Sequence, residues 1–88
     1  MARIVLSRRA RRELHALDWR LRDAAASGIE LLGREPYAGD PLQGRVAGLR
    51  VLRIGSYRIL YELRDGDRTV RVPAIRHRAV AYRRDPRG

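Results

Sequence analysis

Arginine and tyrosine dominate the last third of this 88-residue chain, where they alternate with apolar residues between positions 49 and 84. All 20 basic residues of the chain are arginines, and lysine is absent. A guanidinium group stays protonated at any working pH and offers a planar fork of donors that matches two phosphate oxygens. Such side chains can hold a phosphodiester and stabilise charge that develops on it, but they cannot accept a proton. These residues therefore predict phosphate recognition.

The overall charge points to the same kind of partner. The formal net charge is +10 and the sequence pI is about 11.5. A small domain with this charge is drawn to polyanions, so we expect it to bind nucleic acid or an acidic protein. General solubilisation of the surface is the alternative, for which arginine is a poor choice. A GC-rich coding sequence would also favour arginine, without changing the physical consequence.

Several common kinds of active site have no counterpart in the sequence. The chain has no cysteine, which excludes disulfides and thiolate chemistry. Its two histidines, His15 and His77, cannot form a metal site without carboxylates, and no glycine-rich phosphate loop occurs. Glu62 lies among arginines and is expected to be a structural ion-pair partner rather than half of an acid–base pair. We therefore expect neither a metal nor a cofactor.

The first half of the chain predicts a strand followed by a helical hairpin. The apolar run in residues 3–6 is typical of a strand, and Ser7 and Asp18 offer side-chain oxygens as N-caps for two helices within residues 7–34. Gly28 lies on the apolar stripe of the second helix, where a close approach to a neighbouring element would explain it. Residues 35–48 are rich in glycine and proline and are expected to form a loop.

From residue 49 the apolar pattern changes to a period of two, which predicts three strands over 49–54, 57–64 and 69–75. Gly55–Ser56 and Asp65–Gly66 are turn signals between them. With Asp65–Gly66 as a two-residue loop, the expected pairs are Ile59 with Val72, Tyr61 with Val70, and Tyr57 with Ala74. The predicted order is β-α-α-β-β-β over a single domain of residues 1–88. This is an α+β fold in which a helical hairpin packs on a largely antiparallel sheet.

The strand pattern also predicts which side chains share the open face of the sheet, opposite the helices. This face is expected to carry Arg58, together with Leu60, Glu62, Arg71, Ile75 and His77. Arg50 and Arg53 are three residues apart, so a β-bulge near Val51–Leu52 is needed to bring both onto it. An irregularity at Pro73 would do the same for Arg76.

Two segments resemble a known family. They are Gly48-Leu49-Arg50-Val51-Leu52-Arg53-Ile54-Gly55-Ser56-Tyr57-Arg58-Ile59-Leu60-Tyr61 and Ile75-Arg76-His77-Arg78-Ala79-Val80-Ala81-Tyr82-Arg83, with Asp65-Gly66 between them. This pattern is similar to the RelE/ParE superfamily of bacterial type II toxins, and the resemblance covers nearly the whole chain. It is specific for the superfamily and less so for the activity, because ribosome-dependent ribonucleases and gyrase inhibitors share these elements.

The resemblance implies a toxin that enters the ribosomal A site and cuts mRNA without a metal, by attack of a 2′-hydroxyl on the adjacent phosphate. By position, Arg58 would stabilise the phosphate and Arg76 would be the second catalytic arginine. Tyr82 would stack on or orient the reacting nucleotide, or accept a proton. His77 is the better acid–base candidate chemically, because imidazole titrates near neutral pH. A passive contact with backbone or RNA is the equal alternative for His77.

Four further arginines are expected to bind RNA: Arg50, Arg53, Arg78 and Arg83. RelE-type enzymes often place lysine where Arg50 and Arg53 stand, so the identity of the general base is open. No apolar run approaches the roughly 20 residues needed to span a bilayer and no signal peptide is visible, so we expect a cytoplasmic protein. The resemblance implies an antitoxin whose C-terminal segment, disordered until bound, wraps the toxin. The alternatives are a ParE-like gyrase inhibitor without nuclease chemistry and a catalytically weak family member.

Overall fold

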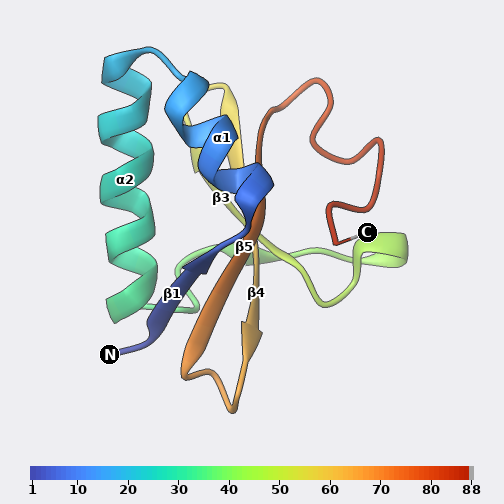
Figure 1. Ribbon diagram of the computed structural model, residues 1–88. Coiled ribbons are helices and arrows are strands. Elements are labelled where there is room, and N and C mark those ends of the chain that lie inside the picture. Colours follow the sequence, from blue (N-terminus) through green and yellow to red (C-terminus); the bar gives the residue numbers. More distant parts are fainter. Residues whose placement is uncertain (88) are drawn as a thin grey trace.

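The computed structural model describes residues 1–87 of the chain. Two helices pack on a five-stranded sheet whose strand order is β1-β5-β4-β3-β2 (Figure 1). The elements are β1 (Arg3–Leu6), α1 (Arg8–Ala16), α2 (Trp19–Arg34), β2 (Asp40–Pro41), the 3₁₀ turn η1 (Gly44–Val46), β3 (Arg50–Ile54), β4 (Tyr57–Arg64) and β5 (Thr69–His77). β1 runs parallel to β5, and the other neighbours are antiparallel. The expected α+β fold is confirmed, and β2 is an additional short strand within the predicted loop.

Both predicted helix caps are present. The Ser7 hydroxyl accepts from the backbone N–H of Ala10 (3.0 Å), and Asp18 accepts from the N–H groups of Arg20 and Leu21. Ser7 also donates to the carbonyl of Pro73 (2.8 Å), so it ties the start of α1 to β5. Ser7 therefore fixes both the helix start and its position on the sheet, whereas the Asp18 cap is exposed and local.

Ser7→Ala is expected to lower the free energy of unfolding by roughly 1–2 kcal/mol, because it removes an N-cap and a tertiary hydrogen bond together. Urea unfolding followed by far-ultraviolet circular dichroism measures this loss. Asp18→Ala removes a cap without a tertiary bond and should cost less, about 1 kcal/mol. An equal or larger loss in Asp18→Ala would contradict the role assigned to Ser7.

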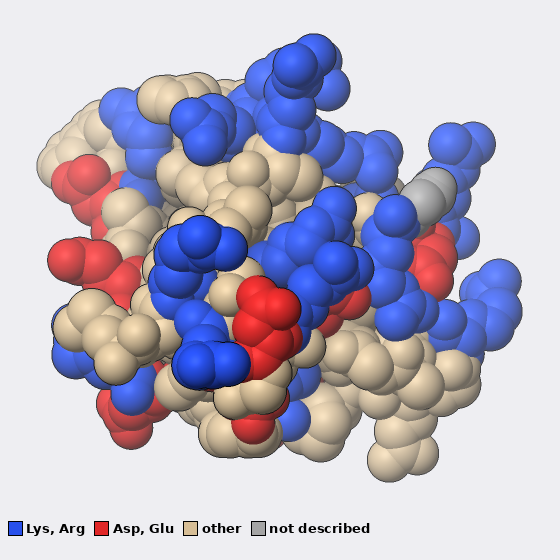
Figure 2. All heavy atoms as spheres, turned by 60° about the horizontal axis from the view of Figure 1, so that its bottom comes forward, with Lys and Arg blue, Asp and Glu red and all other residues tan. Residues whose placement is uncertain are grey.

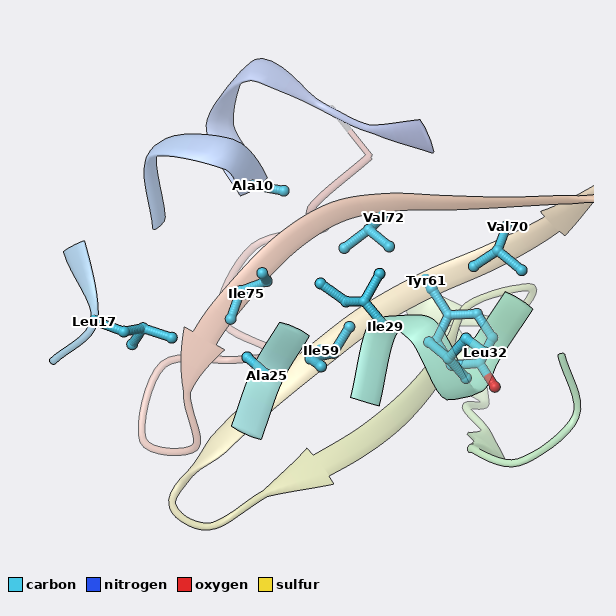
Figure 3. Packing of buried hydrophobic residues seen from close by; sticks show 10 residues of the cluster. All are labelled: Ala10, Leu17, Ala25, Ile29, Leu32, Ile59, Tyr61, Val70, Val72 and Ile75. Carbon is cyan, nitrogen blue, oxygen red and sulfur yellow. The ribbon is translucent and has the colours of Figure 1, made fainter. Parts of the chain in front are cut away.

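The main hydrophobic core lies between α2 and the sheet, with α1 closing one end (Figure 3). Ala25, Ile29 and Leu32 of α2 meet Ile59 and Tyr61 of β4, while further contacts come from β5. The sheet approaches α2 closely at Gly28. A Cβ there would lie 3.0 Å from Ile54 Cδ1 and 3.1 Å from Leu52 Cδ2, which confirms the packing reason expected for this glycine.

The expected register between β4 and β5 is wrong. The hairpin loop contains four residues, Asp65 to Arg68, since Arg64 pairs with Thr69. Asp65, Gly66 and Asp67 all have positive φ, a conformation that the Asp-Gly-Asp sequence tolerates. This loop, together with a register shift between Leu60 and Glu62, pairs Tyr57 with His77 and Ile59 with Ile75. Asp65–Gly66 lies in the turn as predicted, but this dipeptide alone does not determine the length of the loop.

One of the two predicted irregularities is present. The register between β4 and β5 shifts between Leu60 and Glu62, opposite the part of β5 that contains Pro73. The shift brings Arg76 opposite Arg58, so the prediction for Pro73 is confirmed. The prediction of a bulge near Val51–Leu52 is wrong, because β3 and β4 pair without interruption from Arg50 to Ile54.

No helix within residues 1–87 combines the length and the apolar character that crossing a membrane requires.

Candidate functional site

Three arginines form a row across the open face of the sheet. Arg58 is the direct cross-strand partner of Arg53 on one side and of Arg76 on the other. Directly opposed residues have Cβ atoms roughly 4.5–5.5 Å apart, so their guanidinium groups can reach a common ligand. The neighbouring Ile59 and Ile75 point to the helix side, which places these arginines on the open face. We call Arg53, Arg58 and Arg76 the arginine row.

The C-terminal segment, residues 78–87, folds back over this face. Figure 1 shows this segment and α2 on opposite sides of the strands. Ala81 is fully buried, and Arg87 donates to the carbonyls of Ala47 (2.8 Å) and Arg45 (3.1 Å) in the loop before β3. The face beneath contains a second small apolar cluster of Val51, Leu60 and Ala74. The open face of the sheet is therefore partly covered by the end of the chain.

Arg76 is the residue that connects the sheet to this segment. Its Nη1 donates to the carbonyls of Ala81 (3.3 Å) and Arg84 (2.9 Å), and only 8% of its surface is exposed. Burial lowers the pKa of Arg76, and the guanidinium of Arg9 lowers it further, while the carboxylate of Glu13 acts in the opposite direction. Arg76 thus carries its charge at some cost while it holds the chain end in place.

Arg58 has no ion-pair partner among residues 1–87. Its Nη1 donates to the carbonyls of Gly55 (3.2 Å) and Tyr57 (3.1 Å), which orients the side chain without neutralising it. Arg53 differs, because it forms an exposed ion pair with Asp40 (2.7 Å). Exposed pairs of this kind are weak and exchange readily. Arg58 is therefore the member of the row best placed to meet an incoming anion.

Tyr82, Arg78 and Arg83 all belong to the C-terminal segment. The backbone N–H of Arg78 donates to the carbonyl of Ser56 (2.8 Å), which holds the start of the segment against the β3–β4 turn. Tyr82 follows Ala81, whose carbonyl accepts from Arg76, and 40% of its surface is exposed. The structure thus links Tyr82 to the arginine row through Arg76, and it leaves the side chains of Arg78 and Arg83 exposed.

His77 does not join the arginine row. It pairs with Tyr57 and lies on the helix side of β5, with the two rings in an edge-to-face contact 5.4 Å between centroids. Its Nδ1 accepts from the N–H of Ala79 (3.1 Å), and its side chain is exposed. The expectation that His77 and Ile75 share the open face is wrong. The four-residue hairpin loop moves the register by two residues, which keeps the faces, but the register shift between Leu60 and Glu62 adds one residue in β5 and turns Ile75 and His77 to the helix side.

Arg50 also lies on the other face. It pairs with Tyr61, and its guanidinium donates to the carbonyl of Gly39 (2.6 Å) and stacks over Tyr37. Without the predicted bulge, the three-residue spacing of Arg50 and Arg53 puts them on opposite faces. Arg50 therefore supports the loop after α2. Glu62, in contrast, is the expected structural partner, since it pairs with Arg64 (2.7 Å) and Arg71 (3.5 Å).

The end of the chain carries its own ion pair. Arg87 Nη2 lies 2.7 Å from Asp85 Oδ2, and the same guanidinium bonds the loop before β3. The hydrogen bond from Arg87 lowers the pKa of Asp85 from 3.8 to about 2. Because this pKa is depressed in the folded protein, the pair contributes stability above pH 4 and loses it as the pH falls from about 4 to 2.

In Arg87→Ala, the midpoint of the Asp85 carboxyl titration is expected to return from about 2 towards 3.8. A carbon-detected NMR titration of the carboxyl groups measures this directly. Arg84→Ala, three residues away, removes the same charge and should leave the Asp85 titration near its wild-type midpoint. An unchanged Asp85 titration in Arg87→Ala would show that Arg87 does not hold this carboxylate in solution.

A cavity of about 380 Å³ opens between α1 and the C-terminal segment, beside the arginine row. Its walls combine residues from α1, β5 and the chain end. They are Arg9, Glu13, Arg76, Val80, Arg83 and Arg84. Figure 2 shows how far arginines outnumber acidic side chains on the face seen there. The sequence did not predict that Arg9, Glu13 and Arg84 share one site. The four-residue spacing of Arg9 and Glu13 puts them on one helix face, but nothing local indicates that the chain end meets it.

Comparison with known proteins gives consistent matches. Residues 4–82 match the family described as ParE toxin of type II toxin–antitoxin system, parDE. Toxin RelG of Mycobacterium tuberculosis is 42% identical over an alignment of 77 residues that covers 85% of this chain and 88% of that protein. A chain of the M. tuberculosis toxin–antitoxin complex RelBE2 is 35% identical, with a TM-score of 0.78 over 86% of this chain and 96% of that one. A chain of the Escherichia coli RelBE complex has the same fold at 19% identity, with a TM-score of 0.76 over 88% and 96% of the two chains.

Proposed function

This chain belongs to the ParE toxin family of type II toxin–antitoxin systems, and we propose that it acts there as a ribosome-dependent mRNA endoribonuclease of the RelE type. The observation that carries the proposal is the arginine row, in which Arg58 and Arg76 are direct cross-strand neighbours on the open face. Two fixed cations around one phosphate are what an attack by a neighbouring 2′-hydroxyl requires, since negative charge grows on the phosphorus oxygens in the transition state.

In the proposed reaction, the 2′-oxygen attacks the adjacent phosphorus and the bond to the 5′-oxygen of the next nucleotide breaks, which leaves a 2′,3′-cyclic phosphate and a 5′-hydroxyl. The 2′-hydroxyl gives its proton to water, and the departing 5′-oxygen takes a proton from water, because arginine cannot accept one. Arg58 holds and neutralises the non-bridging oxygens from its local carbonyl anchors. Arg76 contributes a second positive charge from the neighbouring strand β5, and its hydrogen bonds position the segment that carries Tyr82. We assign to Tyr82 the role of stacking on or orienting the base beside the scissile bond, and its partly exposed side chain supports this role.

His77 has a smaller part in this proposal. In the structure the Nδ1 of His77 accepts a hydrogen bond from the backbone N–H of Ala79 (3.1 Å), so this nitrogen is already engaged by the chain itself. The ring also lies on the face away from the arginine row. Electrostatic stabilisation by arginine is therefore the main catalytic contribution that we assign to this chain.

We also propose an antitoxin partner. Both of the solved complexes described above pair a similar chain with an antitoxin. An antitoxin segment of acidic or amphipathic character, ordered only on binding, would cover the arginine row and compensate the net charge of +10.

A ParE-like gyrase inhibitor is the second candidate. It is favoured by the description of the matching family and by the position of His77, which leaves the arginine row without a neighbouring imidazole. In this case the row would bind an acidic protein surface, and no RNA would be cut.

Primer extension on mRNA from cells that express the chain distinguishes these functions. The proposed nuclease should produce cuts inside translated codons and halt translation within minutes of induction, and Tyr82→Phe should weaken the cuts. Intact mRNA together with double-stranded DNA breaks would select the gyrase inhibitor instead. Co-expression of an antitoxin should suppress either effect. The two functions are therefore distinguished by whether mRNA or DNA is broken and by where the breaks lie.

A further inference from the structure

The cavity between α1 and the C-terminal segment gathers charge that the protein itself does not neutralise. Of the described residues that line it, four are arginines and one is a glutamate. Glu13 is partly engaged already, because its Oε1 accepts from the backbone N–H of Ile75 (2.9 Å). Its other oxygen lies 3.9 Å from Arg9 Nε, which is a loose ion pair. Positive charge is therefore in excess around a space that is open to solvent.

Glu13 has a structural reason to stand in this arginine-lined wall. β5 continues past the end of β1, since β1 pairs with β5 only from Thr69 to Val72. The backbone groups of β5 beyond that point need other partners, and Ser7 and Glu13 provide them at Pro73 and Ile75. Glu13 thus closes a sheet edge, and the surplus of cations around it is left for something else to balance.

Holding these guanidinium groups close together costs free energy, because like charges repel one another. Arg9 and Arg84 both lower the pKa of Arg76, in addition to the effect of its burial. Like charges that are held together by the fold mark places where an anion would be bound favourably. The cavity volume of about 380 Å³ is ample for a phosphate group with part of its sugar.

We propose that this cavity binds one phosphate of a single-stranded RNA, next to the phosphate held by Arg58 and Arg76. Arg76 lines the cavity and also belongs to the arginine row, so the two sites are contiguous. A chain with regularly spaced charges fits two contiguous cationic sites, whereas a lone carboxylate would fill one of them. Donors from three elements surround the cavity, which suits the tetrahedral array of phosphate oxygens better than a planar carboxylate.

The choice of RNA as the ligand rests on the proposed function, but the binding site itself can be tested without cleavage. The probes are two trinucleotides that carry 2′-O-methyl groups and cannot be cut. One has two charged phosphodiester linkages, and in the other one linkage is a neutral methylphosphonate. Binding to the full chain is followed at low salt by NMR, using the arginine Nε–Hε signals.

For the wild type, the second charged linkage is expected to strengthen binding by about tenfold or more, as one charge-assisted contact would. In the double variant Arg9→Ala/Arg84→Ala this gain should disappear. Both side chains are largely exposed, and the carbonyl of Arg84 that accepts from Arg76 remains. Arg11→Ala removes an exposed arginine from the same helix, outside the cavity, and should keep the gain.

An undiminished gain in the double variant would overturn the proposal. If the same variant also lost affinity for a glutamate-rich peptide, the cavity would be a site for protein carboxylates instead. Primer extension keeps the two hypotheses apart. Cut mRNA without the linkage effect would remove this inference alone, and intact mRNA with the linkage effect would remove the nuclease function alone.

Discussion

Arg58→Ala is expected to reduce mRNA cleavage by about 10²–10³-fold while the fold stays intact. The guanidinium of Arg58 stands on the open face without an ion-pair partner among the described residues, and its Nη1 touches carbonyls of its own turn. Its removal takes away transition-state charge stabilisation and leaves the core of the sheet unchanged. Rates of cleavage in a purified translation system measure the effect, and circular dichroism checks the fold.

Arg64→Ala is the matched control. Arg64 lies on the same strand and the same face, six residues and roughly 20 Å from Arg58, and its loss changes the net charge equally. It should keep cleavage within a few-fold of wild type. A comparable loss of activity in both variants would mean that total charge, rather than the arginine row, drives the reaction. Arg76→Ala is less informative, because Arg76 also holds the C-terminal segment.

Gly39→Ala is expected to cost about 3 kcal/mol of unfolding free energy or more, at the upper end of overpacking effects. A Cβ at this position would lie 2.5 Å from the carbonyl oxygen of Val51 and 2.7 Å from Tyr61 Oη. The neighbouring backbone cannot give way without breaking the bond from Gly39 N–H to Tyr61 (2.9 Å). Tyr61 in turn donates to the carbonyl of Pro36 (2.8 Å), so the whole loop after α2 would lose its anchor.

Gly33→Ala provides the comparison for this prediction. Gly33 is in the last turn of α2, and a Cβ there would meet its nearest atom at an ordinary contact distance of 3.5 Å. Alanine also favours a helix over glycine, so the variant should be neutral or up to about 1 kcal/mol more stable. Thermal and urea unfolding of the two variants settle the matter. Equal stability of both would show that the loop around Gly39 moves aside freely.

Local patterns were sufficient to predict the element order and the helix caps. Ser7 and Asp18 cap their helices as expected, because a cap depends on residues within one turn. The change of apolar period at residue 49 predicted the strands, and Glu62 was correctly expected to pair with arginines. The family resemblance was specific enough to be confirmed by the match over residues 4–82.

The register between β4 and β5 depended on information that no short pattern holds. Asp-Gly fits both a two-residue and a four-residue loop, and β5 also contains one additional residue opposite the step from Leu60 to Glu62. Only the two together give the pairing that buries Ile59 and Ile75 under α2. The register shift between Leu60 and Glu62 moved His77 to the helix side and placed Arg76 beside Arg58. The predicted site therefore kept Arg76 on the open face and lost His77 from it, through one additional residue in β5.

The residue types of this chain determine its chemistry, because many arginines, with neither lysine nor cysteine, favour phosphate recognition. The places where that chemistry is concentrated were decided by contacts between distant segments. The return of residues 78–87 across the sheet brings Arg84 towards Arg9, 75 positions apart in sequence, and builds the cavity between them. The packing of the whole fold brings these arginines together, because their positive charges repel one another. Burial and the backbone hydrogen bonds of the surrounding elements hold them in place.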